Sequence, residues 1–152
     1  MIASTSSPRA LVDTNVVVYA YDVNEPNKHE IARALLRRLS DEGRLIFSAQ
    51  VFNEFGSGMM SRKRKNPFGP DEIAVILREL EATGEVVPIT ASATFRSLAA
   101  MPRHGLSFWD ALIWSAAAEN EVAVIYSEDF QAGRDIERVL FVNPFLPEPS
   151  PT

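Results

Sequence analysis

Short apolar runs alternate along this chain with longer segments in which apolar residues recur every three or four positions. Each run has the length of one buried strand. The longer segments have the period of a helix that buries one face. The pattern therefore predicts five strands, at residues 10–12, 45–47, 86–89, 122–126 and 140–142.

The clearest helical pattern lies between Pro70 and Gly84, where four apolar residues are spaced at i, i+3, i+4 and i+7. Proline is favoured in the first turn of a helix and glycine just after the last turn, so both ends are marked. A second pattern sets Ile31, Leu35 and Leu39 on one stripe. Both segments are predicted to be helices.

Residues 16–21, VVVYAY, fit either a strand or a helix. Three consecutive valines favour a strand through their stiff side chains, whereas Asn15 is a residue type that caps helices. In the rest of the chain short strands alternate with helices, and parallel neighbouring strands require such crossover connections. The sequence therefore predicts an α/β fold, an α/β/α sandwich with a central parallel sheet.

The length of 152 residues predicts a single domain, because it is enough for one core and no repeat or linker divides it. We expect this domain at residues 10–145, a flexible N-terminal tail at 1–9 and a proline-rich C-terminal tail at 146–152. No apolar run approaches the roughly 18 residues that span a membrane. The first ten residues lack the pattern of a secretory signal, and the chain has no cysteine, which fits the cytoplasm.

Acidic residues follow the predicted strands. Asp13 comes directly after the first strand and Asp129 shortly after the fourth, while Asp110 lies three residues beyond Ser107 at the start of a predicted helix. Glu54 stands inside another helical segment among apolar neighbours. Ligand sites in parallel sheets form outside the carboxyl ends of the strands, where these acids are expected.

Three of the four acids also have a simpler interpretation. Asp13 fits a helix cap, Ser107 with Asp110 matches a capping box, and Asp129 fits a turn. Glu54 is too far inside its helix to cap it. Together, four neighbouring carboxylates would repel one another unless they surrounded a divalent cation. Oxygen ligands favour Mg²⁺ or Mn²⁺, and zinc is disfavoured without cysteine and with only two histidines in the chain.

Four segments in this order, LVDTNVVVYAYD, SAQVFNEF, LSFWDALIWSAAAE and YSEDFQAG, resemble the PIN domain family and within it the VapC-type toxin ribonucleases. The resemblance spans most of the chain and implies a helix for residues 16–21. It implies a metal site with four acidic ligands and three polar neighbours. The implied ligands are Asp13, Glu54, Asp110 and Asp129, and the implied neighbours are Thr14, Asn15 and Ser127.

The resemblance also implies a Mg²⁺- or Mn²⁺-dependent endoribonuclease that hydrolyses RNA with metal-activated water. It implies a homodimer and a cognate VapB-type antitoxin that blocks the acidic pocket. Glu128 directly precedes Asp129, so the identity of the fourth acid stays open between them. Within the same family, a nuclease for RNA maturation or a noncatalytic partner-binding module are alternatives.

A net charge of −5 argues against a nucleic-acid partner, but without the four acids the balance is 15 basic against 16 acidic residues. The basic segment Arg62, Lys63, Arg64 and Lys65 fits either a solvated helix end or a surface that contacts RNA phosphates.

Aromatic and imidazole side chains near the acids also have two interpretations. Trp109 and Trp114 fit core positions better than base stacking. Four apolar residues fit the core better than an antitoxin groove, namely Phe52, Phe55, Met59 and Met60. His104 is predicted to lie on a surface loop, and metal-activated water needs no imidazole base.

A phosphoryl-handling domain that uses Asp13 covalently is a rival from another class. Such a domain needs a second acid two residues further on or a lysine at a strand end. Position 15 is asparagine, and the later strands are followed by no such lysine. The sequence therefore favours the nuclease.

Overall fold

The strands form one sheet in the order β3-β2-β1-β4-β6-β5. The structure, a computed structural model, describes residues 7–129 and 133–147. Neighbouring strands are parallel throughout, except that β5 runs antiparallel to β6. The strand bounds are β1 Ala10–Val12, β2 Leu45–Ser48, β3 Glu85–Val87, β4 Val124–Tyr126, β5 Asp135–Ile136 and β6 Val139–Val142.

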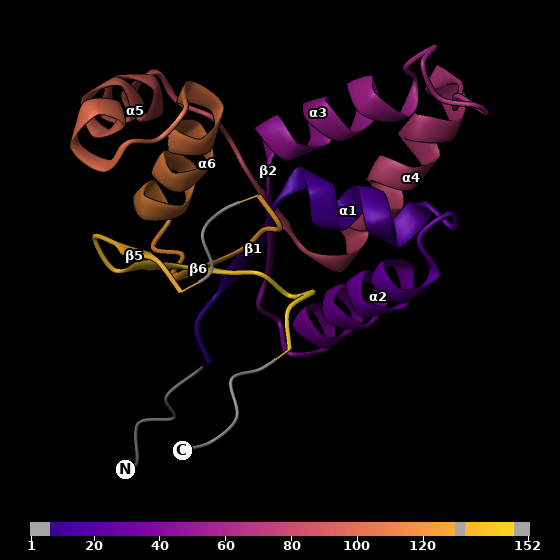
Figure 1. Cartoon of the computed structure of the whole chain (residues 1–152), viewed down its shortest axis with the longest axis horizontal. Helices are drawn as coiled ribbons and strands as arrows, with labels where there is room; N and C mark the ends of the chain where they lie inside the picture. Colours follow the sequence, from indigo (N-terminus) through magenta and orange to yellow (C-terminus); the bar gives the residue numbers. More distant parts are fainter. Residues whose placement is uncertain (1–6, 130–132, 148–152) are drawn as a thin grey trace.

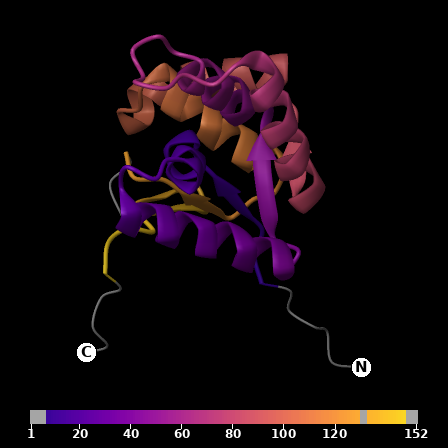
Figure 2. The same ribbon diagram turned by 90° about the vertical axis from the view of Figure 1, so that its right-hand side faces the viewer.

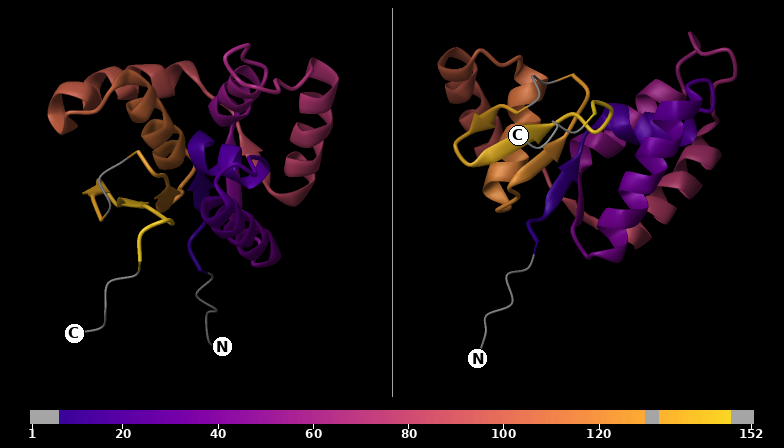
Figure 3. Two further views of the ribbon diagram at one scale, coloured as in Figure 1. Left: turned by 45° about the vertical axis from the view of Figure 1, so that its right-hand side comes forward. Right: turned by 60° about the horizontal axis from the view of Figure 1, so that its bottom comes forward.

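Helices cover both faces of this sheet. Figures 1 and 3 show α5 and α6 on one side of the molecule and α1 to α4 on the other. Figure 2 shows α2 across the sheet from α5 and α6. The predicted α/β/α sandwich is therefore confirmed. The helix bounds are α1 Thr14–Tyr21, α2 Pro26–Asp41, α3 Ala49–Met59, α4 Pro70–Thr83, α5 Ala91–His104 and α6 Phe108–Glu119.

The central strand β1 is buried on both faces, and its side chains divide between two cores. Ala10 and Val12 belong to the core under α1 to α4, whereas Leu11 belongs to the core under α5 and α6. Successive side chains of a strand point to opposite faces, so a strand covered on both sides is apolar throughout. This is why its sequence is a continuous apolar run and lacks an alternating pattern.

Residues 16–21 lie in α1, which begins immediately after β1. The Asp13 carboxylate caps this helix by accepting the Thr14 backbone N–H at 2.7 Å. Val16 and Val17 are fully buried against the sheet. Burial of these valines and the cap outweigh the strand preference of β-branched residues, which is at most about 1 kcal/mol in scale.

Some side chains lie where the sequence predicts and others do not. His104 is the last residue of α5 and does not lie on a loop. Trp109 is 61% exposed, so its expected core position is wrong. Trp114 is 2% exposed and donates its indole N–H to the Ile136 carbonyl, as expected for a core residue. Phe55 and Met59 are fully buried and Phe52 packs partly buried against the same core, as expected. Met60 is 38% exposed, so its expected core position is wrong.

Parts of the two expected tails lie outside the described residues, namely 1–6 and 148–152. Within the described part, the Arg9 guanidinium donates to the Asn120 carbonyl and pairs with Glu85. Residues 7–129 and 133–147 contain no helix that is long and apolar enough to cross a membrane.

Candidate active site

The ends of β1, β2 and β4 define the edge of the sheet where the predicted acids gather. These strands are parallel neighbours, so their carboxyl ends reach the same edge. Val12 is in register with Tyr126, and the Asp13 backbone N–H donates to the Tyr126 carbonyl at 2.9 Å. Asp13 and Ser127, the next residues of their segments, are therefore adjacent.

The Asp13 side chain is the buried acid of this edge, with 5% of its surface exposed. Its Oδ1 accepts the Thr14 N–H, and its Oδ2 accepts the Ser127 hydroxyl at 2.7 Å. Burial raises the pKa of this carboxyl to about 6. The bonds from Ser127 and Thr14 lower the pKa, and the nearby charges of Glu54 and Asp129 raise it.

Glu54 comes to the same edge from α3. Its Oε2 accepts the Thr14 hydroxyl at 3.4 Å, and its Oε1 accepts the Gln50 side-chain amide at 2.5 Å. Both donors are neutral. Among the described residues, no salt bridge from a lysine or arginine compensates the negative charge of Glu54 or Asp13.

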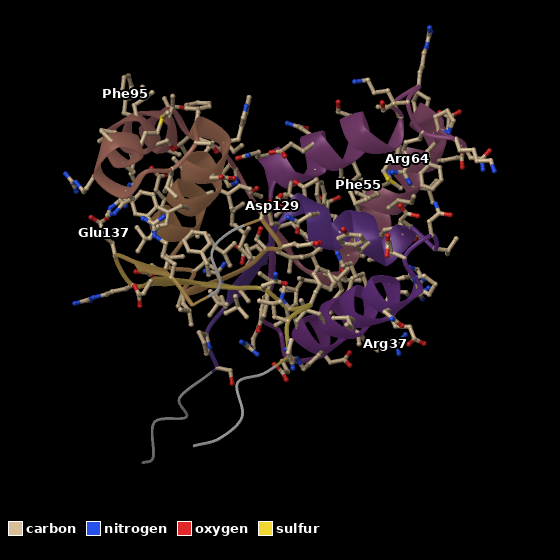
Figure 4. The ribbon with its side chains drawn as sticks, in the orientation of Figure 1. Arg37, Phe55, Arg64, Phe95, Asp129 and Glu137 are labelled. Atoms are coloured by element: carbon tan, nitrogen blue, oxygen red, sulfur yellow. The ribbon has the colours of Figure 1, made fainter. Side chains whose placement is uncertain are left out.

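Asp129 approaches from the segment after β4. Its carboxylate accepts the Asn15 side-chain amide at 3.0 Å, and its backbone N–H donates to the Ser127 hydroxyl oxygen at 3.2 Å. The Asn15 amide also lies 3.3 Å from that hydroxyl. Asn15 and Ser127 thus connect Asp129 to Asp13. In Figure 4, Asp129 lies between the side of α1 and α3 and the side of α6.

Glu128, the other candidate for the fourth acid, has a different partner. Its carboxylate pairs with Lys28 of α2 at 2.5 Å. The Lys28 ammonium also lies over the rings of Tyr19 and Phe145, at 4.9 and 5.7 Å from their centroids. Hydrogen bonds to Glu128 and Tyr19 raise the pKa of Lys28 above its ordinary value. Glu128 is therefore neutralised locally, whereas Asp129 has only an amide partner among the residues described.

Asp110 lies in the first turn of α6, where its backbone N–H donates to the Ser107 hydroxyl oxygen at 3.2 Å. The capping interpretation of Ser107 is therefore correct, and it leaves the Asp110 carboxylate available for another role. The connection from α6 to the other acids passes through Gln50. The Gln50 amide donates both to Glu54 and to the Trp109 carbonyl, one residue before Asp110.

The structure thus brings Asp13, Glu54 and Asp129 into one neighbourhood and links Asp110 to it through a buried amide. Within residues 7–129 and 133–147, no three acidic or histidine side chains are arranged so that they could together hold a metal ion. The donor set still has the chemistry of a divalent-cation site. The site is rich in carboxylate oxygen, and its central carboxylate, Asp13, is buried. Among the described residues, no basic side chain forms a salt bridge with Asp13.

The basic segment lies away from these acids. Figure 4 shows Arg64 near the far end of α3 and well separated from Asp129. The Arg64 guanidinium pairs with Asp22 at 3.3 Å, which joins this segment to the C-terminal end of α1. Arg62, Lys63 and Lys65 are exposed. The segment is therefore a second charged surface, distinct from the acidic edge.

Two residues of the site were not predicted from the sequence. Lys28 neutralises Glu128 across a separation of 100 residues, which no local pattern reveals. Gln50 could have been found, because it is a polar residue one helical turn before Glu54 and therefore on the same face of the helix.

Comparison with known proteins gives consistent matches. A family model described as PIN domain matches residues 10–136. The VapC ribonuclease Mb1869c of Mycobacterium bovis and the ribonuclease VapC13 of Mycobacterium tuberculosis are each 29% identical over 120 residues, covering 78% of this chain and 88% of theirs.

Solved structures show the same fold. VapBC2 from Rickettsia felis, solved with a DNA fragment from its promoter, aligns with a TM-score of 0.62 and 18% identity, covering 87% of this chain and 96% of that one. VapC20 from Mycobacterium tuberculosis, a toxin that cleaves the sarcin–ricin loop, aligns with a TM-score of 0.60 and 19% identity, covering 79% and 89%.

Proposed function

Because the chain belongs to the PIN domain family, we propose that it is a divalent-metal-dependent endoribonuclease of the VapC type. It would be the toxin of a type II toxin–antitoxin pair and act in the cytoplasm. The two relatives that are 29% identical are both named VapC ribonucleases, which supports the RNA-cleaving activity. The observation that carries the proposal is the buried Asp13 carboxylate with Glu54 and Asp129 beside it.

In this proposal Asp13, Glu54, Asp110 and Asp129 hold Mg²⁺ or Mn²⁺. A bound divalent ion supplies an activated water and neutralises negative charge on the phosphodiester. The residues of the chain orient the site. The Thr14 N–H and the Ser127 hydroxyl hold the two oxygens of Asp13, and the Asn15 amide holds Asp129. Because all these donors are neutral, the carboxylates keep their charge for a cation.

Asp129 is the better candidate for the fourth acid. Glu128 is paired with Lys28 at 2.5 Å, so recruiting it would break an ion pair. Asp129 accepts a neutral amide and raises the pKa of Asp13 through its charge. Its carboxylate therefore already interacts with the central ligand, which supports its assignment.

The proposed partners are an RNA substrate, a VapB-type antitoxin and a second copy of the chain in a homodimer. Similar solved structures include VapBC from Salmonella typhimurium bound to DNA and a toxin–antitoxin complex from Klebsiella pneumoniae. These likenesses support the antitoxin as a partner. The exposed Trp109 next to Asp110 is available for stacking on an RNA base, since its ring is not used in the core.

A noncatalytic PIN-like module is the alternative, and one observation favours it. No three acids in the described part are arranged to hold one metal ion. Cleavage of a structured RNA by the purified protein, measured with Mn²⁺, with excess chelator and with Mn²⁺ restored, separates the two functions. The nuclease is expected to lose its activity with chelator and regain it with Mn²⁺. Cleavage that continues unchanged in excess chelator would exclude metal-dependent chemistry. No cleavage under any of the three conditions would favour the noncatalytic module.

Neutralising Lys63 and Lys65 is expected to weaken RNA binding and to reduce its salt dependence. Each lost phosphate contact lowers the slope of log affinity against log salt by about 0.7 for single strands, so the double variant should lose about 1.4. Binding is measured by fluorescence anisotropy at several salt concentrations, with Asp13→Asn in the background to prevent cleavage.

Replacement of Arg138, exposed in the turn between β5 and β6, by glutamine serves as the matched control. An unchanged slope in the lysine variant would return the basic segment to the role of a solvated helix end.

A further inference from the structure

Gln50 is a buried polar side chain at the junction of two helices that carry acids. It lies in the first turn of α3 and is 3% exposed. Burying an amide is unfavourable unless hydrogen bonds compensate for the lost water. Its contacts therefore indicate why an amide occupies this position.

The side-chain NH₂ group of Gln50 has two acceptors on different elements. One is Oε1 of Glu54, one helical turn further along α3, at 2.5 Å. The other is the backbone carbonyl of Trp109 at 3.2 Å, at the start of α6 and directly before Asp110. One amide thus fixes the rotamer of one acid and the position of the helix turn that carries another.

The carbonyl end of the same amide has no comparable role. Gln50 Oε1 is buried, and in the part of the chain that the structure describes it has no hydrogen-bond partner. An apolar side chain of similar length would fill this space without leaving a buried oxygen unsatisfied. Simple packing therefore does not account for the amide, whereas its two donated hydrogen bonds do.

We infer that Gln50 is a positioning residue of the metal site, which holds Glu54 and the start of α6 so that Glu54 and Asp110 can act on the same cation. This inference rests on the proposed nuclease function. Gln50 itself contacts neither RNA nor metal in this role. It acts through Glu54 in the way that groups hydrogen-bonded to metal ligands orient them.

The test is the affinity of the purified protein for Mn²⁺, measured by isothermal titration calorimetry. Gln50→Met keeps the length of the side chain and removes both donors. Gln50→Asn keeps the amide but is one methylene shorter, so it cannot reach both acceptors. Loss of an orienting partner typically weakens metal affinity by about 10- to 100-fold, and this is the expected change for both variants. Asn53→Ala, an exposed position on the same helix, is the control and should bind like the wild type.

Thermal melting of the metal-free proteins separates positioning from a purely structural contact. If Gln50 only joins α3 to α6, the variants melt earlier but bind Mn²⁺ with unchanged affinity below their melting temperature, and the inference is overturned. If Gln50→Met does not fold, Gln50→Asn decides by the same criterion. Failure of the wild-type protein to bind Mn²⁺ would overturn the proposed function and this inference with it, whereas normal wild-type binding with unaffected variants would overturn the inference alone.

Discussion

Replacing Asp13 by asparagine is expected to reduce RNA cleavage by on the order of 10³-fold or more while the protein stays folded. Asp13 is the central acid of the proposed site. Thr14 and Ser127 donate hydrogen bonds to its carboxylate, and the nearby charges of Glu54 and Asp129 raise its pKa. Charge stabilisation by a catalytic metal contributes several kcal/mol to the transition state, and about 4 kcal/mol corresponds to 10³-fold in rate. The initial rate of cleavage of a fluorescent RNA at saturating Mn²⁺ measures the effect.

The same substitution at an acid outside the site provides the control. Asp41 is exposed at the end of α2, and Asp41→Asn should cleave like the wild type. Circular dichroism checks that both variants are folded. Cleavage by Asp13→Asn at the rate of the Asp41→Asn variant would remove Asp13 from the mechanism.

Without metal, Asp13→Asn is expected to be more stable than the wild type at pH 8 by up to about 3 kcal/mol. The pKa of Asp13 rises from its ordinary 3.8 to about 6 in the folded protein, mainly because the carboxyl is buried. One pKa unit corresponds to about 1.4 kcal/mol, so ionising this group in the folded state costs about 3 kcal/mol. Asparagine keeps a side-chain oxygen for the Thr14 N–H and carries no charge.

The stability difference depends on pH in a defined direction. Between pH 3.8 and about 6 the folded wild type binds more protons at Asp13 than the unfolded chain, so this group makes stability fall as pH rises. Above about pH 6 the contribution of this group to the free energy of unfolding has been lost completely. Below about pH 4 the contribution is fully present. The difference in the free energy of unfolding between Asp13→Asn and the wild type should therefore increase from pH 4 to pH 6 and stay constant above pH 6.

Thermal melting with chelator present, at steps from pH 4 to pH 8, measures this difference. For a chain of this size 1 kcal/mol shifts the melting temperature by about 2–4 °C, so a gap of roughly 6–12 °C is expected at pH 8. Asp41→Asn again serves as the control. A wild type that is as stable as Asp13→Asn at pH 8 would mean that Asp13 ionises there without cost and is not the desolvated acid described above.

Most helices and strands of the first half of the chain were predictable, because local and tertiary preferences agree there. β1, β2 and α4 lie where the apolar runs and the Pro70 and Gly84 signals indicate. The resemblance to the PIN domain is confirmed by the family match to residues 10–136. Residues 16–21 needed that resemblance, because three consecutive valines in a helix contradict the propensity of their side chains.

The second half was harder to predict. Phe95 and Leu98 of helix α5 are exposed, and Figure 4 shows Phe95 on the outer side of this helix, so its apolar positions do not form a single buried stripe. Strand β5 has two residues, too few for a periodic signal. Trp109 was expected in the core because it is aromatic and helical, but it lies one position before Asp110 on the open side of α6.

The four acids were proposed from the sequence because Asp13 and Asp129 follow strands and Glu54 and Asp110 lie in largely apolar helical segments. Of their partners, Thr14, Asn15 and Ser127 were expected only from the family resemblance, and Gln50 and Lys28 were not expected. Whether Asp13, Glu54, Asp110 and Asp129 bind one cation remains a prediction. The contacts that prepare such a site, from Thr14, Gln50 and Ser127, join segments up to 114 residues apart. Spacing along the chain carries no information about such contacts, which depend on the order of strands in the sheet.

Anomalous X-ray diffraction from crystals grown with Mn²⁺ shows whether the four acids share one divalent cation. We expect an anomalous peak from a Mn²⁺ ion that is coordinated by the Asp13 carboxylate and by at least two of the other three acids, Glu54, Asp110 and Asp129. Crystals saturated with Mn²⁺ that show no peak at the carboxyl ends of β1 and β4, with each acid bonded only to its local amides and hydroxyls, would contradict this expectation.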